Sequence, residues 1–299
     1  MAQLTGIYAS VAMMLLPVLI CTAIGMGWGY RNIPYPLGFV STLVTVVAIP
    51  GLVFHTLVTT RLAPQHILSV ALAATCGIAV MGVISAVLLR LFGLPVRPLV
   101  TTSTFPNAGN LGLPLSELAF GDTGLSVAVA FFAVCSFLQH TVGVHIVASS
   151  ASVKGSLFSP VMIAAVLAVV LRALDITVPV WALESSRLLG SLTVPLMLIS
   201  LGYTLVTISH GGIRQGAYVG MIRLLVGLVG GTLVINILDQ PPDIARATLL
   251  QMMMPVAVIN YMYAERFTDR GDTAAGAVLS STAVFLLLCP LAFWYAGAL

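Results

Sequence analysis

The chain has 299 residues, of which 59% are hydrophobic and 7% are charged, whereas about 25% of residues are charged in an ordinary soluble domain. This number of charged residues is too small to cover the surface of a soluble protein of this length. The composition therefore predicts a polytopic membrane protein whose main partner is the lipid bilayer. The net charge of +3 is small and scattered, which gives no reason to expect a nucleic-acid partner.

The apolar stretches predict an all-α integral membrane protein with ten transmembrane helices, because the length allows roughly ten spans of about 20 residues with short loops. In chain order the predicted spans cover residues 6–30, 37–60, 66–92, 97–119, 123–149, 157–174, 181–208, 215–238, 242–264 and 273–298. A short polar joint at residues 149–156 separates a first five-helix unit, residues 1–150, from a second, residues 151–299.

The basic residues predict how these spans are oriented. Loops after odd-numbered spans hold eight of the twelve lysines and arginines, namely Arg31, Arg90, Arg97, Lys154, Arg214, Arg223, Arg266 and Arg270. Cytoplasmic loops carry an excess of basic residues, so these loops are predicted to be cytoplasmic, with both termini outside the cytoplasm and the protein in the cell (inner) membrane. Arg223 fits equally well inside the eighth span.

The fourth predicted span is interrupted at membrane depth. Residues 104–114 read TFPNAGNLGLP. The segment holds two prolines, of which Pro106 is the first, and each lacks an N–H donor. It also holds two glycines, of which Gly109 is the first, and each costs roughly 1 kcal/mol in a helix interior relative to alanine. Asn107 and Asn110 carry amides that hydrocarbon cannot satisfy. Unwound backbone persists in a membrane only where it is buried in protein or lines a wet cavity, so the segment predicts a polar site.

The two halves of the sequence resemble each other. Three proline positions of the first half have counterparts in the second half, in the same order and at nearly constant offset: Pro17 with Pro160, Pro50 with Pro195, and Pro106 with Pro255. Five spans are an odd number, so the second half is predicted to be inverted relative to the first. Inverted repeats with matching broken segments are typical of secondary transporters.

The ninth predicted span contains the second break, at Pro255. This proline frees a backbone carbonyl near Gln251, and Gln251 and Asn260 add side-chain amides. In an inverted repeat the two breaks approach each other near the bilayer midplane, so we expect Asn107, Asn110 and Asn260 to converge there.

Broken helices also bring two helix N-termini to this point, each equivalent to about half a positive charge. Such a site suits a small anion, most simply a carboxylate, and it needs no lysine or arginine in the middle of a helix. The alternative is that the prolines only kink their helices and that the asparagines bond to neighbouring helices.

Other polar residues give weaker signals. Thr104 ends a run of hydroxyl side chains before the first break, and Gln139 precedes His140 in the fifth span. These three residues are candidates for an ion site or a polar cavity wall, and a structural role is the alternative. Motifs of serine hydrolases, zinc proteases and phosphate-binding loops are absent, so no enzyme activity, catalytic residue, metal site or cofactor is predicted.

The two broken segments resemble a known family. FPNAGNLGLPL, residues 105–115, is similar to the first-half signature of the auxin efflux carrier family, and MPVAVINYMYA, residues 254–264, resembles the second-half signature. That family includes the PIN-type carriers of plants and bacterial malonate or malate permeases. The resemblance implies two inverted five-helix repeats, broken fourth and ninth helices that cross, and a mobile part that moves like an elevator. Its crossover residues carry over onto Pro106, Asn107, Asn110, Pro255 and Asn260.

The sequence therefore predicts a secondary transporter of a small organic anion, bound by Asn107, Asn110 and the Pro255 break with Pro106, Gly109, Gln251 and Asn260 around it. The alternatives are a sodium-coupled symporter of the bile-acid-transporter type, for which Gln251 and the hydroxyl run are the candidate residues, and a non-transporting membrane receptor or channel. The sequence leaves open which carboxylate is moved, its direction, the coupling ion and the oligomeric state, a homodimer included.

Overall fold

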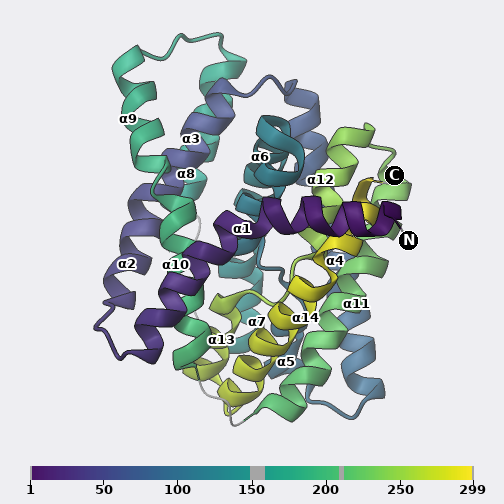
Figure 1. The fold of residues 1–299 in the computed structure, drawn as a ribbon. Helices are drawn as coiled ribbons and strands as arrows, with labels where there is room; N and C mark the ends of the chain where they lie inside the picture. The colour runs from purple at the N-terminus through teal and green to yellow at the C-terminus, as the bar shows by residue number, and fades with distance from the viewer. Residues whose placement is uncertain (1, 149–158, 209–211, 298–299) are drawn as a thin grey trace.

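The computed structural model describes residues 2–148, 159–208 and 212–297, with side chains from Leu16 onward. The predicted polar joint at residues 149–156, with Lys154 and the boundary between the two predicted units, lies outside the described residues. Within them all the regular elements are helices (Figure 1), and one isolated antiparallel β-bridge pairs Pro106 with Val256. An all-helical fold follows from the composition, because a helix satisfies every backbone group within its own segment.

The helices begin and end within a few residues of the predicted spans. The first part of the chain forms α1 (Ala2–Tyr30), α2 (Leu37–Leu43), the π-helical segment η1 (Val44–Ala48), α3 (Ile49–Thr59), α4 (Pro64–Leu91), α5 (Val96–Thr104), the π-helical segment η2 (Ala108–Gly112), α6 (Leu113–Leu138), the π-helical segment η3 (Gln139–Gly143) and α7 (Val144–Ala148). The second part forms α8 (Pro160–Ala173), α9 (Val180–Gly190), α10 (Thr193–Thr207), α11 (Ile213–Leu238), α12 (Pro242–Met253), α13 (Val258–Phe267) and α14 (Gly271–Gly297).

A glycine separates the fourth and fifth predicted spans. The long helix α6 is interrupted at Gly121, whose φ of 61° and ψ of −150° lie outside helical values. A positive φ is accessible to glycine because it has no Cβ. The chain therefore turns between residues 119 and 123, where the sequence predicts a loop.

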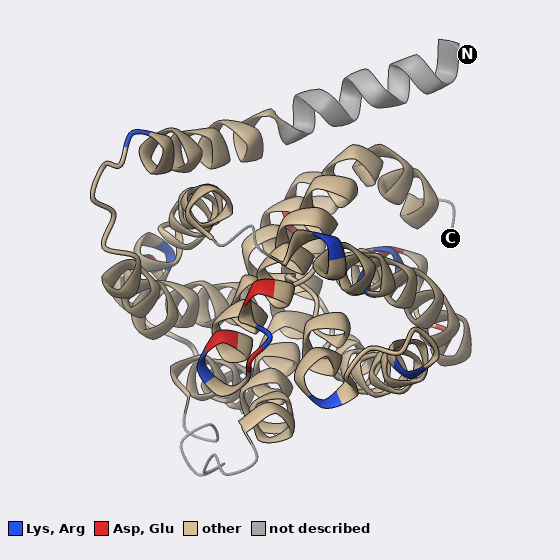
Figure 2. Cartoon of the chain, turned by 90° about the horizontal axis from the view of Figure 1, so that it is seen from below, with Lys and Arg blue, Asp and Glu red and all other residues tan. Residues whose placement is uncertain are grey.

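The length and composition of the helices fit a membrane protein. Six helical stretches of the described chain are long and apolar enough to cross a membrane: residues 37–59, 64–91, 108–148, 180–207, 213–238 and 271–297. Leu16–Tyr30 and Pro160–Ala173 are shorter apolar helices. Seen from below, most helices are viewed nearly along their axes, so they run roughly parallel or antiparallel (Figure 2). The arrangement of ten spans in an inverted repeat stays a prediction.

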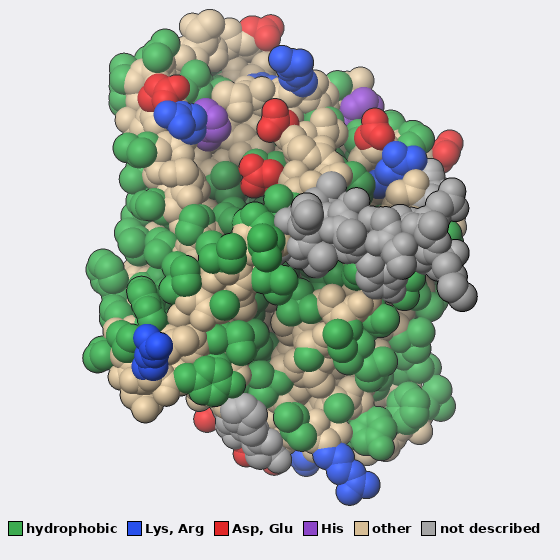
Figure 3. Space-filling model, in the orientation of Figure 1, with side chains coloured by type: hydrophobic (Ala, Val, Ile, Leu, Met, Phe, Trp, Pro, Cys, Tyr) green, Lys and Arg blue, Asp and Glu red, His purple; other side chains and the backbone are tan. Residues whose placement is uncertain are grey.

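The surface agrees with a position in the bilayer. In the space-filling view, acidic and basic side chains gather near the two ends of the molecule, and hydrophobic side chains cover much of the height between them (Figure 3). Large apolar side chains on this surface, such as Val83, Trp181 and Leu287, are more than half exposed. A contiguous apolar surface of this extent marks contact with a membrane.

The helices divide into two groups by their packing. In the first helix group (α1, α2, η1, α3, α8, α9 and α10), α1 packs along α10 and α3 packs against α8 and α9. In the second helix group (α4, α5, η2, α6, η3, α7 and α11–α14), α11 packs against α14 and α4, and α6 packs against α12. The groups meet where α6 contacts α3 and where η2 contacts α10. Each group therefore combines elements from both halves of the sequence.

Two glycines allow α1 and α10 to touch backbone to backbone. A Cβ atom added to Gly25 would overlap the carbonyl oxygen of Ile199, and one added to Gly202 would overlap that of Thr22. Small residues at helix interfaces let membrane helices approach closely, which increases their van der Waals contact. This packing holds the first helix group together without any ionic contact between α1 and α10.

Candidate functional site

The first break occupies residues 105–107, between α5 and η2. Helix α5 ends at Thr104, and the next residue, Phe105, is extended, with a φ of −82° and a ψ of 121°. Extended backbone is what Pro106 imposes on the residue before it, because the proline ring clashes with a helical neighbour. A helix resumes at Ala108, so the local sequence explains both the end and the restart.

The second break occupies residues 254–257, between α12 and α13. Met254 precedes Pro255 and is extended, with a φ of −54° and a ψ of 147°. Ala257 is also extended, with a φ of −68° and a ψ of 135°, and α13 starts at the following residue. The two breaks therefore have the same local structure, in which a proline interrupts a helix that resumes a few residues later.

The two breaks cross in direct contact. The backbone N–H of Asn107 donates to the carbonyl of Pro255 at 2.8 Å, and the N–H of Ala257 donates to the carbonyl of Phe105 at 3.4 Å. These bonds flank the bridge between Pro106 and Val256. The N–H of Val256 donates to Ser281 Oγ at 3.1 Å. The crossing therefore satisfies backbone groups that the breaks expose, and the predicted approach of the two breaks is confirmed.

Four helix ends lie at this crossing. Helices α5 and α12 end there, and η2 and α13 begin there, and helix ends carry carbonyl or N–H groups that have no partner within the helix. Helix N-termini carry partial positive charge and helix C-termini carry partial negative charge. What binds at the crossing depends on which of these ends the protein itself already satisfies.

Arg223 satisfies the negative ends. This residue of α11 is fully buried. Its Nε donates to the carbonyl of Met254 at 3.1 Å, Nη1 donates to the carbonyl of Thr104 at 2.5 Å, and Nη2 donates to the carbonyl of Met252. One guanidinium group thus binds the C-terminal ends of both α5 and α12.

The sequence-based expectation of no lysine or arginine in a helix middle at the site is therefore wrong. Because Arg223 lies inside α11, it no longer counts among the basic residues of the predicted cytoplasmic loops. Seven basic residues then remain in those loops, compared with four in the loops on the other side, so the predicted orientation is unchanged. The signal was present in the sequence, because Arg223 is the one charged residue of residues 215–238. A charge in the middle of a membrane helix marks a functional position by default.

Asn107 has a free side-chain donor. The residue is 3% exposed, and within the described part of the chain its Nδ2 atom has no hydrogen-bond partner. A buried amide without a partner costs about 1–3 kcal/mol. Nearby, Asn110 is half-buried, and a Cβ at Gly109 would stand 2.8 Å from Met197 Cε of α10. The free amide of Asn107 is thus close to the segment where the two helix groups meet.

Asn260 and Gln139 are bonded to each other instead. Gln139 Nε2 donates to Asn260 Oδ1 at 2.7 Å, and Asn260 Nδ2 donates to the carbonyl of Phe105 at 3.2 Å. Asn260 is fully buried. Both of its amide ends are therefore engaged with other protein groups, while the expected convergence of Asn107, Asn110 and Asn260 stays a prediction. Asn260 instead connects α13 to the first break.

Gln251 of α12 contacts Gly112 and Ser116, which follow the first break. Its Nε2 donates to Ser116 Oγ at 2.9 Å, whereas its Oε1 atom has no partner among the described residues. A Cβ at Gly112 would overlap the Gln251 amide, so the glycine is needed for this close contact. Thr104 Oγ1 is also buried and lacks a partner in the described chain. These oxygens are the candidates for further polar contacts at the site.

His140 is held by its own helix. Its Nδ1 lies 2.7 Å from the carbonyl of Ser136, and its ring meets Tyr263 edge-on, with centroids 6.0 Å apart. The residue is half-buried and belongs to η3 beside Gln139. The structure thus places Gln139 at the crossing and His140 next to it.

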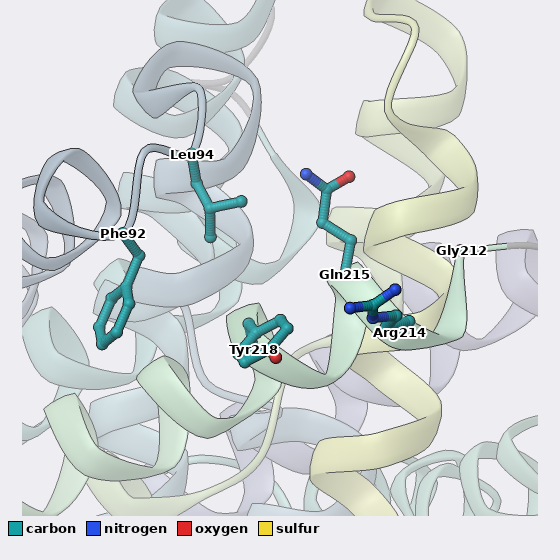
Figure 4. A pocket seen from close by; sticks show the side chains of 6 residues that line it. All are labelled: Phe92, Leu94, Gly212, Arg214, Gln215 and Tyr218. Carbon is teal, nitrogen blue, oxygen red and sulfur yellow. The ribbon is translucent and has the colours of Figure 1, made fainter.

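Two hollows lie outside the crossing itself. One, of about 410 Å³, is lined mostly by apolar side chains of α4, α5 and the stretch from the end of α6 to α7, and it reaches Phe105 at the edge of the first break. The other, of about 600 Å³, lies between the α4–α5 turn and the start of α11, where Leu94 faces Gln215 and Tyr218 (Figure 4). Tyr218 is five residues from Arg223, about 7.5 Å along the helix axis, so this second hollow is separate from the crossing.

Comparison with known families identifies the chain. The family described as membrane transport protein matches residues 10–154 and matches again over residues 149–295. The chain belongs to this membrane transport protein family, which includes the auxin efflux carriers. A search of curated proteins finds no match. Membership indicates membrane transport, and together the two matched ranges cover nearly the whole chain.

Proposed function

We propose that this protein is a secondary transporter of a small organic anion, with a carboxylate bound at the helix crossing in the cell inner membrane. The observation that carries the proposal is the contact between Asn107 and Pro255, because it brings two helix N-termini together at a buried point. Broken helices that meet within a bundle are the usual position of substrate sites in secondary transporters. The family supports transport in general.

The groups at the crossing favour a negative ligand. The N-terminal ends of η2 and α13 are donors, the free Nδ2 of Asn107 is a donor, and Arg223 adds a full positive charge. The acceptor ends of α5 and α12 are already bound by Arg223. A carboxylate accepts hydrogen bonds from such donors and is stabilised by the partial charges of helix N-termini.

The division into two helix groups supports an elevator-like movement. Both breaks, Arg223 and Gln251 belong to the second helix group, so the binding site is able to move as one body against the first. In this proposal the first helix group is the fixed scaffold, and each half of the chain, residues 1–150 and 151–299, contributes one inverted five-helix repeat. The proline pairs at nearly constant offset, Pro17 with Pro160, Pro50 with Pro195 and Pro106 with Pro255, are the support for the repeat.

Purified protein in vesicles tests the proposal. A thermal-shift screen against carboxylic acids, including malonate, malate and indole-3-acetate, identifies a ligand, and its radiolabelled form is then loaded for uptake. Alternating access predicts saturable uptake that is stimulated by unlabelled ligand on the opposite side. Uptake that rises linearly without stimulation indicates a channel. Binding without any uptake indicates a receptor, and either result rejects the transporter.

Sodium-coupled symport is a second candidate function, favoured by the unpartnered oxygens of α12. Gln251 Oε1 and Thr248 Oγ1 are buried without a partner among the described residues, and they lie three residues apart, on one face of the helix. Oxygen atoms of this kind bind small cations. The charge of Arg223 opposes a cation close by. Substrate affinity in sodium and in choline buffers decides between the mechanisms, because equal values exclude sodium coupling.

A further inference from the structure

Arg223 places a full charge inside the protein, and no ion-pair partner for it lies among the described residues. The three ion pairs of the described chain join Arg187 with Glu184, Arg246 with Asp243 and Arg270 with Asp269. Arg223 takes part in none of these pairs, and the titratable neighbour that acts on it within the described chain is the neutral thiol of Cys135. Its three carbonyl partners satisfy hydrogen-bond donors but carry no formal charge.

An uncompensated buried charge is expensive, and a hydrophobic side chain of similar volume is often as good for stability. The contacts of Arg223 show what its charge is near. Its Nε binds the carbonyl of Met254, and the next carbonyl along the chain, that of Pro255, accepts the N–H of Asn107 at 2.8 Å. The guanidinium is thus on the order of 10 Å from the backbone of Asn107, and a charge acts over such a distance in a medium of low dielectric constant.

We propose that Arg223 determines the charge of the substrate: its single positive charge selects a monoanion over a neutral analogue and over a dianion. This inference rests on the proposed function, because it concerns the same site. A monocarboxylate makes the crossing electrically neutral. A neutral amide leaves the charge of Arg223 unbalanced, and a dicarboxylate leaves one negative charge unbalanced in the protein interior, which is unfavourable for the same reason.

Arg223 acts in this proposal as a positioning and specificity-determining residue rather than as a direct ligand. Three of its nitrogen atoms are engaged with the ends of α5 and α12. The direct donors to the carboxylate are the Asn107 amide and the N–H groups that start η2 and α13. A lysine at this position keeps the charge but loses the planar fork that reaches several carbonyls at once.

The charge rule is the proposed preference for a monoanion over a neutral analogue and over a dianion. Two sets of probes with matched shape test it on full-length protein in vesicles. The first set is butyrate, butyramide and succinate, and the second is indole-3-acetate and indole-3-acetamide. Wild-type protein is expected to bind a monocarboxylate at least about tenfold more tightly than its amide, and butyrate about tenfold more tightly than succinate, since buried charge complementarity has effects of this order. Comparable binding of the amide, or preference for succinate, overturns the charge rule while leaving carboxylate transport in place.

Variants of Arg223 test whether this residue causes the preference for monocarboxylates. Arg223→Lys is expected to keep the order of the probes with weaker binding, and Arg223→Met is expected to reduce the preference of monocarboxylate over amide to about twofold or less. Arg187→Met, which removes an exposed arginine of the first helix group, is the control and leaves the order unchanged. A folded Arg223→Met protein that keeps the full preference overturns the assignment. If Arg223→Met does not fold, the probe order in the wild type and in Arg223→Lys decides. Failure of every carboxylate to bind wild type rejects the proposed function instead.

Discussion

Asn107 and Pro255 come from opposite halves of the chain, yet the backbone N–H of Asn107 donates to the carbonyl of Pro255 at 2.8 Å. Each proline break exposes backbone groups that hydrocarbon cannot satisfy, and each break supplies a partner for the other. The crossing therefore compensates part of the cost of two broken helices. It also leaves the Nδ2 atom of Asn107 without a hydrogen-bond partner among the described residues, which is the property expected of a ligand-binding group.

Asn107→Ala is expected to abolish substrate binding and to leave the folded protein intact. The amide Nδ2 makes no hydrogen bond with the described protein, so the substitution removes an unsatisfied buried donor and is not expected to lower the free energy of unfolding. Ligand-induced thermal shift and vesicle uptake measure the binding, and size-exclusion chromatography measures the fold. A variant that unfolds while residual protein binds normally shows that Asn107 is structural.

Asn260→Ala is expected to give the opposite result. This side chain donates to Phe105 O and accepts from Gln139 Nε2, and it is fully buried. Its loss leaves an unpaired carbonyl and an unpaired amide, so we expect destabilisation of about 1–3 kcal/mol. Thermal unfolding in detergent measures the change, and Asn107→Ala is the matched control. Equal stability of the two variants would contradict the distinction between a free and an engaged asparagine.

Gly112→Ala is expected to displace Gln251. The new Cβ would stand 2.9 Å from the Gln251 Cδ atom, so the amide must move and lose its bond to Ser116 Oγ. Crowding of this kind in a packed core costs about 1–3 kcal/mol. Gly38→Ala is the control, because a Cβ there meets no atom within 4 Å. A melting temperature that falls for Gly112→Ala and not for Gly38→Ala supports the contact, whereas equal values count against it.

Gly25→Ala and Gly27→Ala lie in the same helix and are expected to behave differently. A methyl group at Gly25 overlaps the backbone of Ile199 in α10, whereas a methyl group at Gly27 meets nothing within 4 Å. We therefore expect Gly25→Ala to destabilise the first helix group by about 1–3 kcal/mol and Gly27→Ala to be neutral or slightly stabilising. Thermal unfolding of both proteins in one detergent makes the comparison. Equal melting temperatures would show that α1 does not pack on α10 through Gly25.

Sequence reasoning located the breaks at Pro106 and Pro255 because their causes are local. A proline removes a donor and restricts its neighbour wherever it occurs, and a glycine or asparagine beside it strengthens the signal. The span boundaries are local for the same reason, since length and hydropathy define them. The loop predicted between residues 119 and 123 coincides with the interruption of α6 at Gly121.

The roles of the polar side chains depended on partners that are distant in the sequence. Asn107 and Asn260 look alike in the chain, but only the fold brings Gln139 to Asn260 and leaves the amide of Asn107 free. Arg223 could be placed either in a loop or in a span, and only the fold brings it to the carbonyls of both breaks. By itself the sequence determined a membrane-embedded helical chain with two interruptions, because backbone chemistry and hydropathy act locally. The tertiary structure decided which groups are satisfied and which remain free, because a hydrogen bond needs both of its partners in place.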